Sequence, residues 1–280
     1  MQDILFQISG YPEPTPTTAI EQAVRFASVV GGKLTGLTVQ AEFRVKDNAL
    51  ANYLIGLNRL AVEEEARSRQ ACEQALADFA AAAGEREVLR DTLTARAELF
   101  TIEDVVARHA RTRDLCIVAV GSNLDGQRAI AEAVIFGSGR PVLLFRADTP
   151  DLVSQGLNTV VLAWDGSRTS ARAMADAMPV LKLAGQVRVL TVLNEKPDAR
   201  PGLGADAVRH LQAHGVAAVA DEIDSGGKPI GTVLDAYNAT HGADLLVMGA
   251  YGRSRIREFV LGGATRHMMD DPKTPLLLSH

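Results

Sequence analysis

The residues best suited to chemistry are glycines gathered in one stretch near the end of the chain. Gly249 and Gly252 follow a short apolar run, and after nine further residues come Gly262 and Gly263. Glycine has no Cβ, so the backbone can turn sharply there and approach a ligand closely. Free N–H groups at a helix start point outward, and the helix dipole favours an anion. The stretch predicts a phosphate site, although a turn followed by a helix cap fits the spacing equally well.

Charged and polar side chains occur where they can complete such a site. Arg253 and Arg255 lie just after the first two glycines and add positive charge. Trp164 and Asp165 end another apolar run, and we expect them to face the glycine loop, because ligands of open parallel sheets bind beyond the carboxyl ends of the strands. Asp165 is suited to accept hydrogen bonds from ribose hydroxyls or to help hold a metal ion. The loop is not a Walker A motif, since no Gly-Lys-Ser/Thr follows, and not the Rossmann fingerprint, which belongs after the first strand.

The second half of the chain alternates short apolar runs with segments of helical periodicity. Pro179 lies inside the first helical pattern and is expected to kink that helix or end it early. His241-Gly242 predicts a helix end. We expect strands at residues 158–164, 187–192, 217–223, 245–248 and 275–278, with helices at 171–181, 206–214 and 230–241 and before Met269.

The first half follows the same order, so the chain is predicted to be a repeat. Strands are expected at 4–8, 34–39, 114–118 and 141–144, a helix at 19–30, and a capping box at Thr101–Asp104. From Val39 to Val88 is 49 positions, against 27 from Val192 to Val219. The extra residues carry a charged, alanine-rich helix around 63–83. We interpret it as a crossover helix packed on the sheet rather than as a partner-binding or membrane-surface helix.

Alternating strands and helices predict an α/β fold with doubly wound parallel sheets. We place the two tandem domains at residues 1–147 and 158–280, joined near Arg146–Leu157, a stretch with Asp, Pro, Ser and Gly. The net charge of −5 argues against nucleic-acid binding. The start lacks the pattern of a signal peptide, no apolar run is long enough for a membrane span, and Cys72 and Cys116 are expected to be buried thiols. Together these features predict a cytoplasmic protein.

The glycine spacing resembles the ATP-binding motif of the universal stress protein family. Ala163–Ser167 is similar to that family's first-strand end and Pro275–Leu278 to its terminal strand, so the resemblance covers nearly the whole chain as a tandem pair. It implies a five-stranded parallel sheet in each domain, terminal strands that meet across a pseudo-twofold axis, and ATP, with or without Mg, lying across the strand ends. The implied contacts are Asp165 on the adenosine side, Val192 at the adenine, and, for ribose and phosphates, Met248, Gly249, Gly252, Gly262, Gly263 and Ala264.

One position departs from the family pattern. Serine or threonine directly follows the last glycine of the family motif, and here that position is Gly263. The backbone amide is kept, but a hydroxyl is lost. Thr265 is a candidate replacement, although two positions further along a helix it faces a different way. The departure puts the affinity in question more than the place of the site.

The first half lacks these features. Aligning Asp114 with Asp244 puts Ala119 and Ser122 where Gly249 and Gly252 stand. The segment between this aspartate and the proline before the last strand is 27 positions long, against 31 in the second half. The first strand ends without an aspartate. We predict that the first half binds no nucleotide.

The leading hypothesis is a cytoplasmic stress-response protein with one site for ATP or another adenine nucleotide in its second domain. The alternative is an interaction or structural protein with an empty site, and a slow ATPase ranks last because no motif places a general base or nucleophile.

His210 and His214 are spaced to bind a metal, but no third ligand is evident and a solvated helix face is preferred. A homodimer of tandem chains, paired through helices, stays open.

Overall fold

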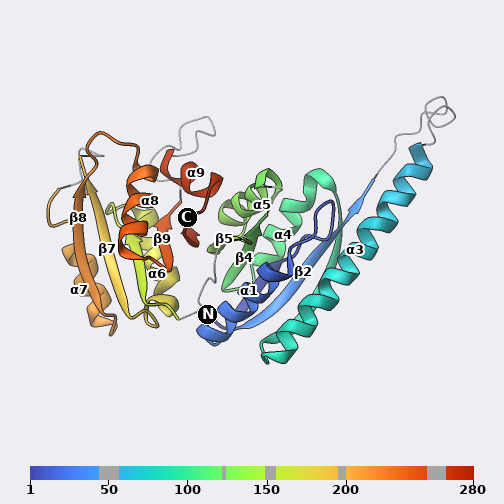
Figure 1. Cartoon of the computed structure of the whole chain (residues 1–280), viewed down its shortest axis with the longest axis horizontal. Coiled ribbons are helices and arrows are strands. Elements are labelled where there is room, and N and C mark those ends of the chain that lie inside the picture. The colour runs from blue at the N-terminus through green and yellow to red at the C-terminus, as the bar shows by residue number, and fades with distance from the viewer. Residues whose placement is uncertain (44–56, 122–123, 149–155, 195–199, 251–262) are drawn as a thin grey trace.

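The strands of the chain form one continuous sheet of two parallel halves. The computed structural model describes residues 1–43, 57–121, 124–148, 156–194, 200–250 and 263–280. Within these residues the strand order is β3-β2-β1-β4-β5-β10-β9-β6-β7-β8 (Figure 1). The strands are β1 (Asp3–Gln7), β2 (Lys33–Glu42), β3 (Leu89–Glu98), β4 (Leu115–Val120), β5 (Val142–Arg146), β6 (Thr159–Ala163), β7 (Gln186–Leu193), β8 (Ala218–Asp224), β9 (Leu245–Gly249) and β10 (Leu276–Ser279).

The two halves are related by a pseudo-twofold axis between β5 and β10. Strands within each half pair in parallel, whereas β5 and β10 pair antiparallel, with Leu277 opposite Leu143. The order reads the same from either outer edge, which confirms the predicted tandem pair of five-stranded sheets and the meeting of their terminal strands. The order reverses between β1 and β4, and again between β6 and β9, so each half has a switch point where ligands of such sheets bind.

Helices cover both faces of the sheet, as alternating strands and helices require. One apolar core joins the sheet to α1 (Thr17–Val30), α3 (Leu57–Glu85), α6 (Arg168–Leu181) and α7 (Ala205–Ala213). The core on the other face joins it to α4 (Ile102–Ala110), α5 (Leu124–Gly137), α8 (Ile230–His241) and α9 (Gly263–Asp270). Leu276 and Leu278 face the second core and Leu277 the first, the two-residue period of a strand buried on both sides.

Local signals set most helix ends. Gly31 and Gly242 end α1 and α8 in the left-handed conformation, with φ of 67° and 57°. Helix α6 runs through Pro179 and ends two residues later at Leu181. The predicted capping box at Thr101 is wrong: its hydroxyl donates to the Glu98 carbonyl at 3.0 Å, and a 3₁₀ turn, η1 (Leu99–Thr101), precedes α4. The Thr101 side chain accepts no hydrogen bond from the first turn of α4, so it does not cap this helix.

The long helix α3 packs on the sheet, as predicted for a crossover helix. Buried Cys72, Phe79 and Ala83 lie on the side that meets β2, and the Phe79 ring contacts that of Phe6 at 6.0 Å between centroids. Near its start, Leu60 and Val62 are exposed, and these first turns rise past the rest of the first half (Figure 1). Among the described residues, no helix is long and apolar enough to cross a bilayer.

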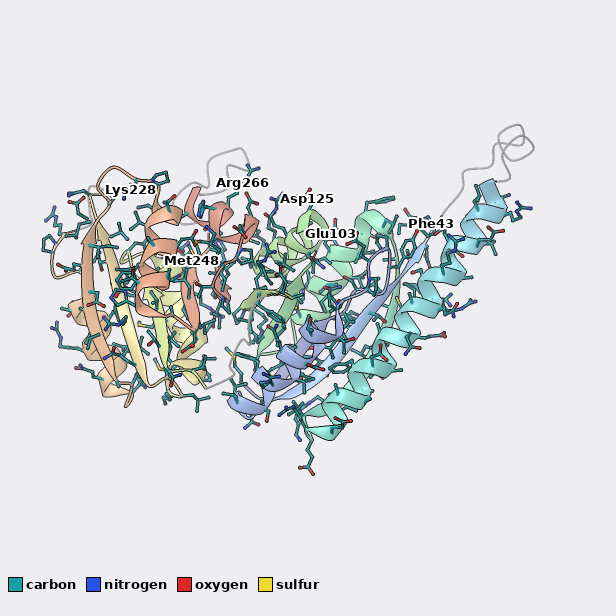
Figure 2. All side chains as sticks on the ribbon, viewed as in Figure 1. Phe43, Glu103, Asp125, Lys228, Met248 and Arg266 are labelled. Carbon is teal, nitrogen blue, oxygen red and sulfur yellow. The ribbon has the colours of Figure 1, made fainter. Side chains whose placement is uncertain are left out.

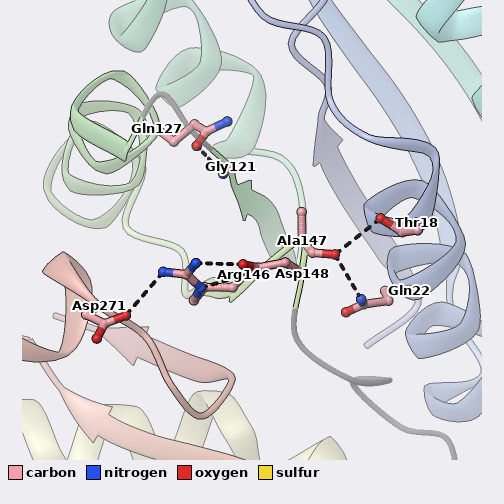
Figure 3. A network of polar contacts seen from close by, with 8 residues as sticks. All are labelled: Thr18, Gln22, Gly121, Gln127, Arg146, Ala147, Asp148 and Asp271. Carbon is pink, nitrogen blue, oxygen red and sulfur yellow. Dashed lines mark hydrogen bonds and ion pairs between the residues drawn. The ribbon is translucent and has the colours of Figure 1, made fainter.

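Ion pairs join the two halves beside the central strands. Arg128 of α5 pairs with Asp270 of α9, and the two helices lie side by side on one face (Figure 1). Arg146 at the end of β5 reaches Asp271 at 3.2 Å while also holding Asp148 at 2.7 Å, and the neighbouring Ala147 carbonyl accepts from α1 (Figure 3). The first half is therefore in direct contact with the helix that follows the glycine loop.

Candidate functional site

Gly249, the first glycine of the predicted loop, lies directly against a neighbouring helix. A Cβ at Gly249 would come within 2.5 Å of the Thr169 carbonyl carbon and 2.6 Å of the Ser170 nitrogen, both backbone atoms in the first turn of α6. Real Cβ atoms do not approach backbone atoms so closely, and the backbone there cannot move aside cheaply. Glycine at this position is therefore required by packing, whatever ligand the loop holds.

Asp165 lies on the short connection between β6 and α6, at the carboxyl end of the sheet. Its Oδ1 accepts a hydrogen bond from the Ser167 N–H at 3.0 Å, and the Ser167 hydroxyl in turn accepts from the Ser170 N–H at 3.1 Å. These bonds form an Asx turn and an N-cap, which fix the start of α6. Ser167 is therefore the N-cap of α6. The half-buried Asp165 carboxylate is held at the edge where a ligand of the second half would lie.

The side chain of Trp164 is oriented differently from what its place in the sequence suggests. Its indole packs on the core shared with α6 and α7, and Nε1 donates to the Leu203 carbonyl at 3.2 Å. Four other predicted site residues belong to the opposite face, which α8 and α9 cover. They are Ala163, Val192, Met248 and Ala264. The predicted residues thus gather at one end of β6, β7 and β9, but on two sides of the sheet.

Helix α9 begins at Gly263, so the described part of the predicted phosphate loop is its final residue and a helix start. Gly263 is exposed, and a Cβ placed on it meets no described atom within 4 Å. The first N–H groups of a helix have no partner within the helix and carry the positive end of its dipole. Thr265, the candidate hydroxyl, is only 3% exposed and packs inward. Gly252, Arg253, Arg255 and Gly262 lie outside the described residues.

At the equivalent edge of the first half, a side chain of the same half hydrogen-bonds to the backbone. Strand registers place Val39 at the position of Val192, and Gly121 two residues beyond the equivalent of Gly249. The Gly121 N–H donates to Gln127 Oε1 at 2.6 Å (Figure 3). The Gln127 side chain is buried, with 6% of its surface exposed. The amide that would face a ligand therefore has an internal partner. No sequence motif indicated Gln127, because a glutamine in the first turns of a helix has no distinctive spacing.

A cavity nevertheless lies at this edge, which we call the first-half cavity. It has a volume of about 280 Å³ and opens between the ends of β1 and β2, η1, and the starts of α4 and α5. Its lining combines apolar and polar residues, including Gln7, Ser9, Tyr11, Val39, Leu99, Phe100, Ile102, Glu103, Gln127 and Ile130. The sequence predicts that the first half lacks a nucleotide motif, but it does not predict this cavity.

A second hollow, about 470 Å³, lies beside the outer strand β8 and α8. On its wall Asp221 accepts hydrogen bonds from the Tyr237 hydroxyl and from Arg188 Nη1. Burial would raise the pKa of Asp221, but these two bonds outweigh it and hold that pKa below its usual value. Burial, followed by the bond to Asp221, raises the pKa of Tyr237 to about 12. The network stays ionised at Asp221 and protonated at Tyr237 near neutral pH, which is a stable arrangement rather than a reactive one.

The described residues contain no group of three or more side chains arranged to hold a metal ion. His210 and His214 lie on α7 with ring centroids 4.7 Å apart, in edge contact with one another. Among the described residues, no third ligand from another element joins these two histidines.

Comparisons with known proteins find one family model and several solved structures that are similar to this chain. The family model of the universal stress protein family matches residues 156–280, and no curated protein sequence matches the chain. A solved universal stress protein from Archaeoglobus fulgidus DSM 4304 covers 98% of this chain and 97% of its own, with a TM-score of 0.70 at 14% identity. A putative universal stress protein from Pseudomonas aeruginosa UCBPP-PA14 covers 100% and 93%, with a TM-score of 0.55 at 18% identity.

At these identities the likeness to solved structures shows the fold, and it extends over both halves of the chain. The family match covers the half that holds Gly249, Asp165 and α9. Residues 156–280 therefore match the universal stress protein family, and the first half repeats the fold of this domain in a tandem arrangement.

Proposed function

We propose that the second half binds one adenine nucleotide, ATP with or without magnesium, across the carboxyl ends of β6 and β9. The observation that carries the proposal is the start of α9 at Gly263, directly after the glycine motif and beside the switch point of the sheet. The positive end of the α9 dipole lies there, and the N–H groups of Gly263 and Ala264 are proposed to donate to phosphate. Membership of residues 156–280 in the universal stress protein family supports the same ligand.

The remaining part of the ligand is assigned to residues that the sheet brings to this end. The Asp165 carboxylate, fixed by its bond to Ser167, is proposed to accept from the ribose hydroxyls. Val192 and Met248, on the face of α8 and α9, are proposed to border the base and the ribose. Arg253 and Arg255 are proposed to add charge near the phosphates. The cellular role we propose is that of a cytoplasmic stress-response protein that senses or carries this nucleotide.

Titration calorimetry of the full chain with ATP and magnesium tests the proposal. We expect one site per chain, and we expect Gly252→Val to weaken binding at least about tenfold by blocking close approach of the backbone. Ser122→Val changes the aligned position of the first half and is the matched control, with unchanged affinity. Both variants are compared for unfolding temperature without nucleotide, so that a folding defect is recognised.

Three results would contradict the proposal. They are no binding at millimolar ATP, equal binding by the wild type and Gly252→Val, and loss of binding on Ser122→Val. The first of these would favour the alternative that the second half has an empty site and the protein acts through contacts with other macromolecules. Nucleotide that co-purifies with the chain would exclude that alternative.

A further inference from the structure

The first-half cavity lies at the switch point of its sheet but lacks a place for phosphate. Gln127 is more than nine-tenths buried, and its Oε1 accepts a hydrogen bond from the Gly121 N–H at 2.6 Å. This amide is therefore not available to an anion. The cavity is nonetheless open, with about 280 Å³ of space between β1, β2, α4 and α5. Pockets for drug-sized ligands begin at roughly 300 Å³, so a compact molecule fits best.

The charge of the lining selects the class of ligand. Glu103, in the first turn of α4, is the acidic residue of the lining, and the lining that the structure describes contains no lysine, arginine or histidine. No ion pair joins Glu103 to another described residue, and it lies at the upper end of the first half in Figure 2. A carboxylate without a counter-ion disfavours an anion and favours a cation or a strong hydrogen-bond donor.

The walls supply apolar and aromatic surface around this carboxylate. Val39 and Ile130 are buried at the inner end. Phe100 is 73% exposed at the opening, an unusual exposure for an aromatic side chain. Tyr11 forms another part of the wall, and its hydroxyl is fixed by donating to Glu64 Oε2 of α3 at 2.7 Å. Aromatic faces beside a carboxylate are a favourable setting for an organic cation.

We propose that the first-half cavity binds a small organic cation, with its ammonium group at Glu103 and a compact apolar or aromatic body against Val39, Ile130 and Phe100. The second half offers amide donors at a helix start, whereas the first half offers a carboxylate and apolar walls. The two halves therefore take ligands of opposite charge. The proposal concerns a different site from the nucleotide loop and holds whether or not ATP binds there.

The matched probes 2-phenylethylammonium and 2-phenylethanol test the role of charge, because they share a ring and a chain length. Binding to the full chain is followed by ligand-observed NMR and quantified by calorimetry. We expect the cation to bind and the alcohol to bind at least about tenfold more weakly, the ratio that a charge-assisted hydrogen bond supplies. No binding of the cation, or equal binding of the two probes, would overturn the proposal.

Two neighbouring acidic residues provide a matched pair of variants. Glu103→Gln keeps the shape of the lining and removes its charge, and we expect it to reduce affinity for the cation to that for the alcohol. Asp104→Asn removes an exposed charge from the same helical turn, outside the lining, and we expect no change. Equal affinities in these two variants would overturn the assignment of Glu103.

A competition measurement locates the probe. Saturating ATP is expected to leave the affinity for 2-phenylethylammonium unchanged, because an anion has no place in the first-half cavity. Displacement of the probe by ATP would place it in the second half and overturn the proposal, while leaving the proposed nucleotide site standing. Failure of ATP to bind at all would leave the probe measurements unaffected, so the two proposals fail separately.

Discussion

The two halves of the chain share a sheet order but differ at the ends of their first strands. In the first half, residues 8–16 connect β1 to α1, whereas in the second half residues 164–167 suffice to connect β6 to α6. The shorter connection brings the first turn of α6 against the end of β9, where only a glycine fits. The equivalent residue of β4 is Ala119, which is buried and has a Cβ. The sequence predicts that Gly249 contacts a ligand. The structure shows that Gly249 is also needed because the short connection packs α6 against it.

The halves also differ in what satisfies the backbone beyond the switch point. In the first half, Gln127 accepts a hydrogen bond from the Gly121 N–H, whereas α9 of the second half begins at an exposed Gly263. A buried amide needs a partner, so a half without a ligand has to supply one from its own chain. The first half therefore satisfies the Gly121 amide with a side chain of its own rather than with a ligand.

The largest effect that separates the halves is expected from Gly249→Ala. The new Cβ would lie 2.5 Å from the Thr169 carbonyl carbon, so α6 or β9 must shift, and we expect a loss of about 2–3 kcal/mol in the free energy of unfolding. The reverse change in the first half, Ala119→Gly, is expected to cost only about 1 kcal/mol. Urea unfolding of both variants measures the difference. Similar losses in the two variants would show that α6 does not restrict Gly249 in solution.

The fold was predictable because its signals are local and repeated. Apolar runs, helix periodicity and the spacing of Asp114 and Asp244 predict each half, and the terminal strands Pro141–Phe145 and Pro275–Leu278 predict where the halves meet. The candidate site was predictable only as a list of positions. The orientation of the Trp164 indole, the contact of Gly249 with α6 and the bond from Gly121 to Gln127 depend on tertiary packing. A single sequence has no periodic signal for such contacts.

Asp114 and Asp244 represent what the halves keep in common. Asp114 Oδ2 accepts from the N–H groups of Gln2 and Asp3 at 2.7 and 3.1 Å, and Asp244 Oδ2 accepts from those of Asn158 and Thr159 at 2.7 and 2.8 Å. Each aspartate thereby fixes the start of the first strand of its half. We expect Asp114→Ala and Asp244→Ala to lower the free energy of unfolding by similar amounts, about 1–2 kcal/mol each. Denaturant unfolding at pH 7 compares them, and a loss in one half alone would break the equivalence.

The contribution of Asp114 also has a predicted pH dependence. Burial would raise its pKa, but the two backbone hydrogen bonds outweigh this effect and hold the pKa below the usual value of 3.8. A carboxyl whose pKa is lowered by folding stabilises the fold above its unfolded value, and this contribution is lost as the pH falls through its folded value. The difference between the wild type and Asp114→Ala should therefore be full at pH 6 and smaller at pH 3. A difference that does not shrink on acidification would assign the effect to packing instead.

The smallest expected effect, that of Gly263→Ser, tests the proposed contrast between a second half with a phosphate site and a first half without one. A Cβ at Gly263 meets no described atom within 4 Å, so serine is accommodated without moving α9. Its hydroxyl would stand at a helix start, where it can donate to a phosphate oxygen, and one such bond is worth about 0.5–1.5 kcal/mol. We therefore expect affinity for ATP to rise roughly two- to tenfold by calorimetry.

Gly263→Ala is the control, because it adds the same Cβ without a hydroxyl and should leave affinity unchanged. An equal gain in both variants would mean that the helix start had been stiffened, because alanine and serine both restrict the backbone more than glycine does. A gain from serine alone would show that the phosphate lies within hydrogen-bonding distance of the first residue of α9.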